Sequence, residues 1–290
     1  MTRRPTVGLI TYNKLPQLTL DDQLLISVLH KRGIVAEPVV WDDEMVEWDK
    51  IKLAIFRSPW DYFHRYTEFL DWLDRIASVT SLWNPPSLVR WNSHKRYLFD
   101  LAEQGIPIVP TVALTQGTSV DIATLLADLG WDNAVLKPAV SGGAYGALLV
   151  RPTTIVTAQK HLNSLLTEHD MLVQPYLSSV AEYGERSLVY IAGTFSHAAR
   201  KDPALTLEAE AGRDTGSTTQ AVEAAQDEIM LAEHVLATLN HPILYARVDT
   251  IRDVTGVPLL MELEAFEPSL YLRLNPQAVE RLADAIVAKL

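Results

Sequence analysis

Three carboxylates and one guanidinium near the end of the sequence are spaced so that they would share one surface. They belong to Arg247, Asp249, Glu262 and Glu264. A turn at Asp253–Gly256 predicts a β-hairpin, and side chains alternate between the two faces of a strand, so all four would point to one side. Three carboxylates placed together repel one another, and a hard divalent cation with oxygen ligands would relieve this repulsion. The alternative is a solvated face whose arginine neutralises part of the charge.

A hairpin that is symmetric about this turn predicts the register of its two strands. Asp249 would face Leu260, and Arg247 would face Glu262. The other face would be apolar and would cover a core, with Val248, Leu259, Met261 and Leu263.

A lysine followed by a glycine-rich turn lies near the middle of the sequence. Lys137 closes one apolar strand, and Gly142, Gly143 and Gly146 precede a second apolar strand at 147–150. Glycines tolerate positive φ, and successive N–H groups of such a turn form an anion nest beside the lysine charge. The spacing is neither a Walker A loop nor a dinucleotide fingerprint. A phosphate-binding loop is one interpretation, and an ordinary glycine hairpin with a solvated lysine is the other.

A second lysine, Lys95, would lie in the first turn of a helix that Asn92 or Ser93 caps. A lysine gains nothing from the helix dipole at that end, so its position favours another purpose. The alternative is a solvated surface lysine.

Polar side chains follow the predicted strand 52–56, at Arg57, Ser58 and Asp61. Ligands of parallel sheets collect at the carboxyl ends of strands. An arginine can bind a carboxylate in bidentate fashion and an aspartate can bind an ammonium, so we expect contacts with a small zwitterionic substrate. Ser269 would help to shape the pocket. The alternative is that Arg57 and Asp61 pair with each other to fix the loop.

The elements that position these residues divide into three predicted lobes, at 1–90, 91–178 and 179–290. Strand and helix patterns in the first 80 or so residues alternate as in an α/β lobe with a parallel sheet. The second lobe would begin after Trp83–Pro86 and contain an edge segment at 106–111. Further helices are predicted at 120–129 with Ser119 as cap, 158–168, 223–239 and 277–290.

The stretch 203–220 is polar, carries glycines and has no clear period. A structureless run of this length inside a compact chain is more often a lid than a packing element. We therefore expect a lid here.

Composition narrows the classes of function. A length of 290 residues and a hydrophobic content of 48% suffice for more than one core. A net charge of −11 argues against nucleic-acid and anionic-membrane partners, which need a basic surface. The chain has no cysteine, so disulfides, thiolate nucleophiles and zinc–thiolate sites are excluded. No signal peptide or membrane span is apparent, which predicts a cytoplasmic protein.

Together these elements resemble an ATP-grasp enzyme, of the superfamily that includes glutathione synthetase, D-alanine–D-alanine ligase and RimK-type ligases. The resemblance covers essentially the whole chain. It implies an α/β fold in which a Rossmann-like N-terminal lobe precedes two α+β lobes that clasp ATP. It also implies ATP and Mg²⁺ as cofactors. The usual acid-x-Asn motif ends here as Glu262-Leu-Glu264, which makes the site more acidic.

The resemblance also assigns roles to residues of this sequence. Contacts with the nucleotide phosphates are implied for Lys95, Lys137, Ser141, Gly142, Gly143 and Gly146. The hinge strand that meets adenine would be Gln174, Pro175, Tyr176 and Leu177. The implied Mg²⁺ ligands are Asp249, Glu262 and Glu264. Charge stabilisation during phosphoryl transfer falls to Arg186, Lys201 and Arg247.

More narrowly, the segments 56–62, 91–98 and 261–270 resemble the subgroup that contains D-cycloserine synthetase, which closes the ring of O-ureido-D-serine with ATP. The implied activity is a C–N bond-forming ligase that acts through an acylphosphate on a small amino-acid derivative. The alternatives are an amino-acid or peptide ligase of RimK or glutathione-synthetase type, and a non-catalytic nucleotide-binding protein. The sequence does not decide the oligomeric state, and a homodimer is one option.

Overall fold

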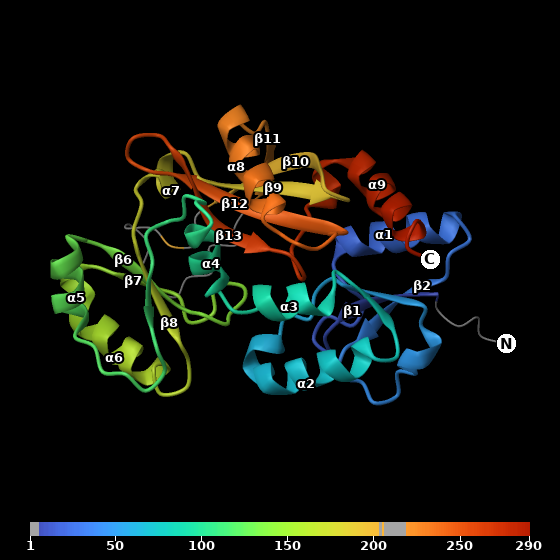
Figure 1. Ribbon diagram of the computed structural model, residues 1–290, viewed down its shortest axis with the longest axis horizontal. Coiled ribbons are helices and arrows are strands. Elements are labelled where there is room, and N and C mark those ends of the chain that lie inside the picture. The colour runs from blue at the N-terminus through green and yellow to red at the C-terminus, as the bar shows by residue number, and fades with distance from the viewer. Residues whose placement is uncertain (1–5, 203–204, 206–218) are drawn as a thin grey trace.

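The computed structural model describes residues 6–202, 205 and 219–290. Figure 1 shows three β-sheets with helices packed around them, and in the described part of the chain the sheets hold four, five and four strands. The predicted lid at 203–220 lies outside the described residues except for position 205 and Thr219–Gln220. Within the described ranges, the helices are too short or too polar to cross a bilayer.

The N-terminal sheet is parallel, as the sequence predicts, and its strand order is β2-β1-β3-β4. Its strands β1 and β3 are buried along their whole length, which is why they read as continuous apolar runs. The sequence did not predict the three-residue strand β4 or the short helix α3, because elements as short as these show no clear periodicity. The elements are β1 (Val7–Thr11), α1 (Leu20–Lys31), β2 (Ala36–Val40), β3 (Leu53–Phe56), α2 (Tyr66–Ala77), β4 (Ser81–Trp83) and α3 (Pro86–Asn92).

The middle sheet is antiparallel, with strand order β5-β8-β6-β7. Two local predictions are wrong. The edge strand is β5 rather than 106–111, and Asp121, which accepts a hydrogen bond from the Thr124 N–H, caps α5 in place of Ser119. The elements are α4 (Tyr97–Glu103), β5 (Val112–Leu114), α5 (Ile122–Leu129), β6 (Ala134–Pro138), β7 (Leu148–Val150), α6 (Ile155–Leu165) and β8 (Met171–Pro175).

The C-terminal sheet is antiparallel, with strand order β11-β10-β9-β12-β13. Helix α8 packs on one face of this sheet, and α9 lies beside α1 of the N-terminal lobe (Figure 1). The predicted lobe boundary at 90 falls inside α3, whereas the boundary at 178 precedes α7. The elements are α7 (Ser179–Glu182), β9 (Glu185–Ile191), β10 (Thr194–Lys201), β11 (Thr219–Val222), α8 (Gln226–Ala237), β12 (Tyr245–Arg252), β13 (Pro258–Glu264) and α9 (Pro276–Val287).

A β-bulge sets the register of the β12–β13 hairpin, and the symmetric pairing predicted above is wrong. The observed pairs are Arg247–Glu264, Asp249–Glu262 and, on the turn side of the bulge, Thr250–Leu260. On the turn side of the bulge, the extra residue in β13 reverses which side chains face the core. Leu260 is therefore buried in the core with Val248, whereas Leu259 and Met261 are partly exposed. Beyond the bulge, Glu262 and Glu264 keep the predicted face, beside Asp249 and Arg247.

Four consecutive backbone carbonyls after β13 are held by side chains. The acceptors are residues 265–268, and their donors in order are Asn84, Tyr245, Trp60 and Arg57. Three of these donors belong to the N-terminal lobe. The lobe therefore fixes the path of the chain that leaves the acidic strand.

Asn84 is fully buried and joins two sheets. Its Nδ2 also donates to the Tyr245 carbonyl at 2.7 Å, and its Oδ1 accepts from the Leu244 N–H at 2.6 Å.

Asn84→Ala would leave buried backbone groups without partners, so we expect a loss of about 2–4 kcal/mol in the free energy of unfolding, measured by urea denaturation. Asn13→Ala, at an exposed position, is the control. Equal stability of both variants would contradict the assigned role.

Candidate active site

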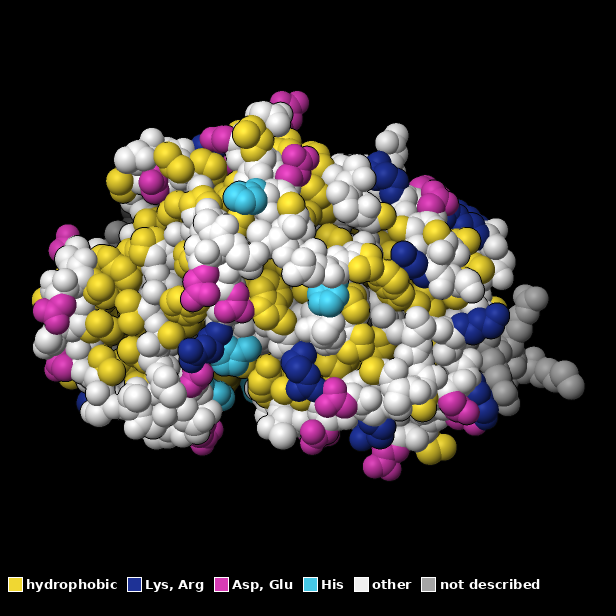
Figure 2. Space-filling model, viewed as in Figure 1, with side chains coloured by type: hydrophobic (Ala, Val, Ile, Leu, Met, Phe, Trp, Pro, Cys, Tyr) yellow, Lys and Arg dark blue, Asp and Glu magenta, His cyan; other side chains and the backbone are white. Residues whose placement is uncertain are grey.

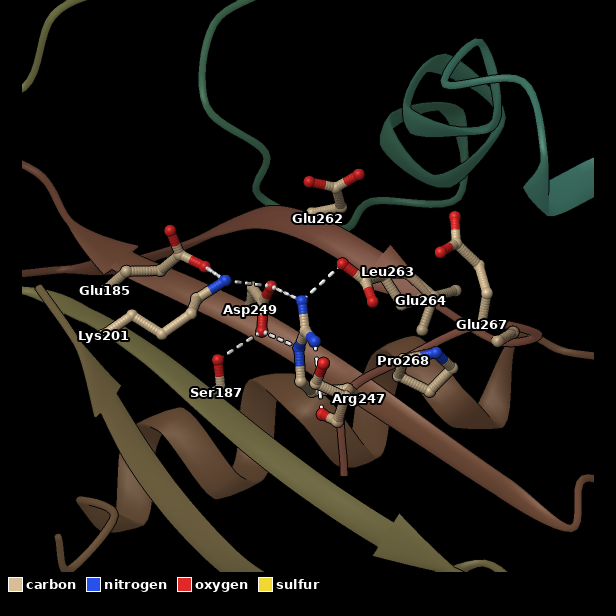
Figure 3. A network of polar contacts seen from close by, with 12 residues as sticks. Glu185, Ser187, Lys201, Arg247, Asp249, Glu262, Leu263, Glu264, Glu267 and Pro268 are labelled. Atoms are coloured by element: carbon tan, nitrogen blue, oxygen red, sulfur yellow. Dashed lines mark hydrogen bonds and ion pairs between the residues drawn. The ribbon is translucent and has the colours of Figure 1, made fainter. Parts of the chain in front are cut away.

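The centre of the site is a buried ion pair on β12 (Figure 3). Arg247 donates from Nε to Oδ1 of Asp249 and from Nη2 to Oδ2, both at 2.8 Å. Ser187 donates to Oδ1 at 2.7 Å, and Lys201 donates to Oδ2 at 2.9 Å. Burial alone would raise the pKa of Asp249, but Arg247 and Lys201 outweigh it and lower this pKa. Both oxygens of Asp249 are fully used.

Lys201 links this pair to Glu185 on the neighbouring strand β9, with which it also forms an ion pair. Burial raises the pKa of Glu185 to about 7, and the attraction of Lys201 only partly opposes this. Burial lowers the pKa of Lys201, but its two carboxylate partners more than compensate, so this pKa is raised. One lysine thus bridges two carboxylates.

Lys95 connects the acidic strand to the glycine-rich loop. Its Nζ lies 3.1 Å from Oε1 of Glu262 and donates to the Ser141 carbonyl at 2.7 Å. Lys95 precedes α4 instead of lying in its first turn, so the predicted capping by Asn92 or Ser93 is wrong. Its buried position excludes a solvated surface lysine.

Lys137, at the end of β6, is close enough to Glu262 to influence its ionisation. Burial lowers the pKa of Lys137, with Glu262 opposing the shift. Burial likewise disfavours the charge of Glu262, but Lys95 and Lys137 outweigh it and lower its pKa. Both predicted phosphate lysines therefore lie within electrostatic range of Glu262, and Lys95 forms an ion pair with it.

The loop 141–146 has the conformation that its glycines predict. Gly143 and Gly146 have φ values of +56° and +67°. A Cβ on Gly146 would lie 2.8 Å from a side-chain atom of Pro138, so only glycine fits there. The ring of Tyr145 packs on Phe63 of the N-terminal lobe, with centroids 5.0 Å apart. Gly142 also lies under Phe63, where a Cβ would approach the ring to 3.3 Å.

Two further carboxylates complete the acidic side of the site. Glu264 forms an ion pair with Arg247, and burial nevertheless raises its pKa. Glu267, which the sequence analysis did not single out, is buried beside it, and burial together with the charge of Glu264 raises its pKa well above the usual range. The third acid of the run Glu262-Leu-Glu-Ala-Phe-Glu267 is the signal that would have identified it.

The predicted metal ligands face protein cations in this structure. Asp249 contacts Arg247 and Lys201, Glu264 contacts Arg247, and Glu262 contacts Lys95. Among the described residues, no three His, Cys, Asp or Glu side chains are arranged to hold a metal ion. The chemistry still fits Mg²⁺, because Glu262 and Glu264 each use only one carboxylate oxygen in contacts with the described residues.

Arg186 is not brought to this cluster. It leaves β9 on the face opposite Glu185 and Ser187, because neighbouring side chains alternate. Its guanidinium carbon lies 4.0 Å from the ring centroid of Tyr183, whose hydroxyl donates to Glu228 of α8. In this arrangement the guanidinium of Arg186 lies over the ring of Tyr183, so its expected role in stabilising the transferred phosphoryl group stays a prediction.

The predicted hinge is the end of β8 and the residues after it. Gln174 and Pro175 pair with β6, and Gln174 donates from Nε2 to the Thr111 hydroxyl at 2.9 Å. The Tyr176 N–H donates to the Asn133 carbonyl at 2.9 Å. Leu177 follows directly and leads into α7, so the segment connects the middle and C-terminal sheets.

The residues predicted to contact a substrate separate into two groups. Arg57 and Ser269 line a cavity of about 440 Å³, but Ser58 and Asp61 do not. Ser58 shares a hydrogen bond with the Thr11 hydroxyl at 2.9 Å. Asp61 accepts from Trp41 Nε1 and from Arg65, each at 2.7 Å. Asp61 is thus committed to its own loop.

Arg57 does not pair with Asp61, so that alternative is wrong as well. Its Nε lies 2.7 Å from Oδ1 of Asp22, and both side chains are almost fully buried. Burial disfavours the charge of Arg57, but Asp22 more than compensates, and the pKa of Arg57 is raised. Arg57 forms part of the cavity wall with its charge already neutralised.

Comparison with known proteins shows to which family this chain belongs. Residues 7–84 match the family model described as D-cycloserine synthetase DcsG, N-terminal domain. The cycloserine biosynthesis protein DcsG of Streptomyces lavendulae is 34% identical over 278 residues, which cover 92% of each protein. The chain belongs to the DcsG family. This DcsG-family chain is an ATP-dependent carboxylate–amine ligase of the ATP-grasp superfamily.

Solved structures agree with the fold of a DcsG-family protein. The crystal structure of D-cycloserine synthetase DcsG has a TM-score of 0.87 and 31% identity, covering 98% of this chain and 99% of that one. D-alanine–D-alanine ligase of Bacillus anthracis complexed with ATP has a TM-score of 0.71 and 16% identity, covering 99% and 97%. A RimK domain protein of Sphaerobacter thermophilus has a TM-score of 0.71 and 18% identity, covering 98% of each chain. The last two similarities concern the fold alone.

Lys137 gives a direct test of the predicted phosphate site. Removing its charge with Lys137→Ala should weaken ATP binding by about 1.5–3 kcal/mol, the range for a hydrogen bond to a charged group. Calorimetric titration measures this change. Lys160→Ala, an exposed lysine on α6 of the same lobe, is the matched control. Equal ATP affinity of wild type and Lys137→Ala would show that Lys137 serves the fold only.

Proposed function

We propose that this chain is a Mg²⁺- and ATP-dependent ligase that converts the carboxylate of a small amino-acid derivative into an acylphosphate and then forms a C–N bond, closing the ring of O-ureido-serine. The observation that carries this proposal is the ion pair of Lys95 with Glu262 beside the Arg247–Asp249 pair. The similarity to a cycloserine biosynthesis protein along 92% of the chain supports the substrate class.

The nucleotide would lie between the middle and C-terminal sheets. Lys95, Lys137 and the N–H groups of the loop 141–146 would bind its phosphates, and the hinge at 174–177 would meet adenine. Solved ATP-grasp relatives support the ligand classes, since D-alanine–D-alanine ligase was crystallised with ATP and the ligase PsnB with Mg and ADP.

The carboxylates would hold Mg²⁺ once nucleotide is present. Glu262 and Glu264 have an oxygen each to offer, whereas Asp249 can join them only if Lys201 or Arg247 releases it. Nucleotide phosphates would attract Lys201 and free one oxygen of Asp249. When bound, Mg²⁺ would neutralise charge on the phosphates during transfer.

The reaction would proceed in two steps. A substrate carboxylate oxygen attacks the γ-phosphorus of ATP, a new P–O bond forms, and ADP leaves with the bridging oxygen. A nitrogen then attacks the acyl carbon, the C–N bond forms, phosphate departs and the nitrogen loses a proton. In O-ureido-serine this nitrogen is bonded to the side-chain oxygen, so its attack closes a five-membered ring. The ring nitrogen still carries the carbamoyl group of the ureido substituent, which water would release as CO2 and NH3 to leave cycloserine. Arg247 would position the carboxylate and balance the negative charge of the intermediate.

The surface gives no reason to expect a nucleic-acid substrate. On the face that Figure 2 shows, acidic and basic side chains are interspersed. This distribution agrees with the net charge of −11, because nucleic-acid binding needs a basic surface.

Glu262 tests the metal role. Glu262→Gln keeps the shape of the side chain but removes its charge, so turnover should fall by about 100-fold or more while the fold persists. ADP release across a Mg²⁺ titration measures this, with Glu103→Gln at an exposed position of α4 as control. An unchanged Mg²⁺ dependence in Glu262→Gln would show that the carboxylates do not hold metal.

The substrate is tested by ADP release from purified protein with ATP and Mg²⁺. O-ureido-D-serine should stimulate release strongly, and its enantiomer and simple amino acids should do so less. Product analysis by mass spectrometry distinguishes ring closure from joining of two molecules. ADP release that needs a peptide or protein acceptor would instead favour a RimK-type modifying ligase.

A further inference from the structure

The cavity at the junction of the N- and C-terminal lobes has a charged lining, to which the proposed reaction assigns no role. Its volume of about 440 Å³ is within the range of small-molecule sites. Its lining includes Asp21, Asp22, Arg57, Ser269, Tyr271 and Arg273. Two acids and two arginines in one small cavity match a zwitterionic ligand.

One of the two acids is not available to a ligand. Asp22 is almost fully buried, with Oδ1 bound to Arg57 Nε at 2.7 Å and Oδ2 accepting from the Thr19 hydroxyl at 2.7 Å. Both carboxylate oxygens of Asp22 therefore have hydrogen-bond partners, and Nη2 of Arg57 donates to the Pro268 carbonyl. This buried pair forms the wall.

Asp21 is different, although it is the next residue in the same first turn of α1. Its side chain is 13% exposed, and the two contacts that it makes, with Arg273 Nε at 2.6 Å and the Arg273 N–H at 3.3 Å, both use Oδ1. Within the described ranges, Oδ2 of Asp21 has no hydrogen-bond partner. The Arg273 side chain is 63% exposed. An ion pair with so exposed a partner contributes little, so a ligand can displace it at low cost.

Two residues that line the cavity also contact Arg247. The Ser269 carbonyl accepts from Arg247 Nη1 at 3.2 Å, and the Arg247 guanidinium carbon lies 5.6 Å from the Tyr271 ring centroid. Ser269 and Tyr271 both line the cavity. A ligand whose carboxylate approaches Arg247 therefore extends towards the first turn of α1.

We propose that Asp21 binds the α-ammonium group of the amino-acid substrate and that Arg273 covers Asp21 until substrate displaces it. This inference rests on the proposed function and assigns to Asp21 the ammonium contact that the sequence suggested for Asp61. The α-ammonium takes no part in bond formation, so Asp21 determines specificity and does no chemistry. The opposing explanation is that Asp21 and Arg273 only tie α1 to the 272–274 turn.

The test compares O-ureido-D-serine with its desamino analogue, 3-(ureidooxy)propanoate, in ADP-release assays. For Asp21→Asn we expect kcat/KM for the amino acid to fall about 10- to 100-fold, with KM for ATP unchanged. The desamino analogue, which lacks the ammonium, should be used equally by Asp21→Asn and wild type. Arg273→Gln should leave kcat/KM for the amino acid unchanged or raise it, because a competitor for Asp21 is removed. Asp71→Asn, on the exposed side of α2, is the matched control.

Two results would overturn the inference. One is an equal loss with both substrates in Asp21→Asn, and the other is a loss in Arg273→Gln as large as that in Asp21→Asn, since a purely structural pair predicts both. Wild-type protein that uses the two substrates equally well would also refute the ammonium contact while leaving the proposed function standing. Wild-type protein that releases ADP with neither would refute the proposed function itself.

Discussion

The buried carboxylate of Asp249 can stay ionised only because Arg247, Lys201 and Ser187 donate four hydrogen bonds to its two oxygens. An ion removed from water without such partners is strongly destabilising. The donors come from three adjacent strands, β12, β10 and β9, so the register of the C-terminal sheet must be maintained for the ion pair to exist. In return the pair fixes Arg247, whose remaining nitrogen donates to the carbonyl of Ser269, a residue that lines the cavity between the N- and C-terminal lobes. Structure and chemistry depend on the same contacts.

The site keeps its charges in balance before any ligand arrives. Lys95 neutralises Glu262, and Lys201 bridges Glu185 and Asp249. Phosphates would compete for the lysines, and Mg²⁺ would compete for the carboxylates. Either ligand alone would break the lysine–carboxylate contacts and leave one partner without a counter-charge. The two ligands together would give both partners new contacts. This exchange explains why the carboxylates do not form a ready-made metal site. Binding of nucleotide and metal should therefore be strongly interdependent.

Most of the fold could be predicted from the sequence, because the buried strands, amphipathic helices and glycine loop have local signals. The shared face of Arg247 and Asp249 was also predictable from alternation. The pairing within the hairpin was not, since a bulge beside Leu260 has no signature in a run of apolar residues. The placement of Asp61 differs for another reason: its type suits the chemistry, but only the tertiary structure reveals that Trp41 and Arg65 already engage it.

The chain after β13 is held by the carbonyls of residues 265–268, three of which accept from side chains of the N-terminal lobe. Every amino acid presents the same carbonyl, so this attachment does not depend on which side chains occupy those positions. Evolution can therefore alter side chains that face the cavity while the acidic strand keeps its place. Relatives with different substrates could diverge by such changes without passing through unstable intermediates, provided that the four donor side chains are retained.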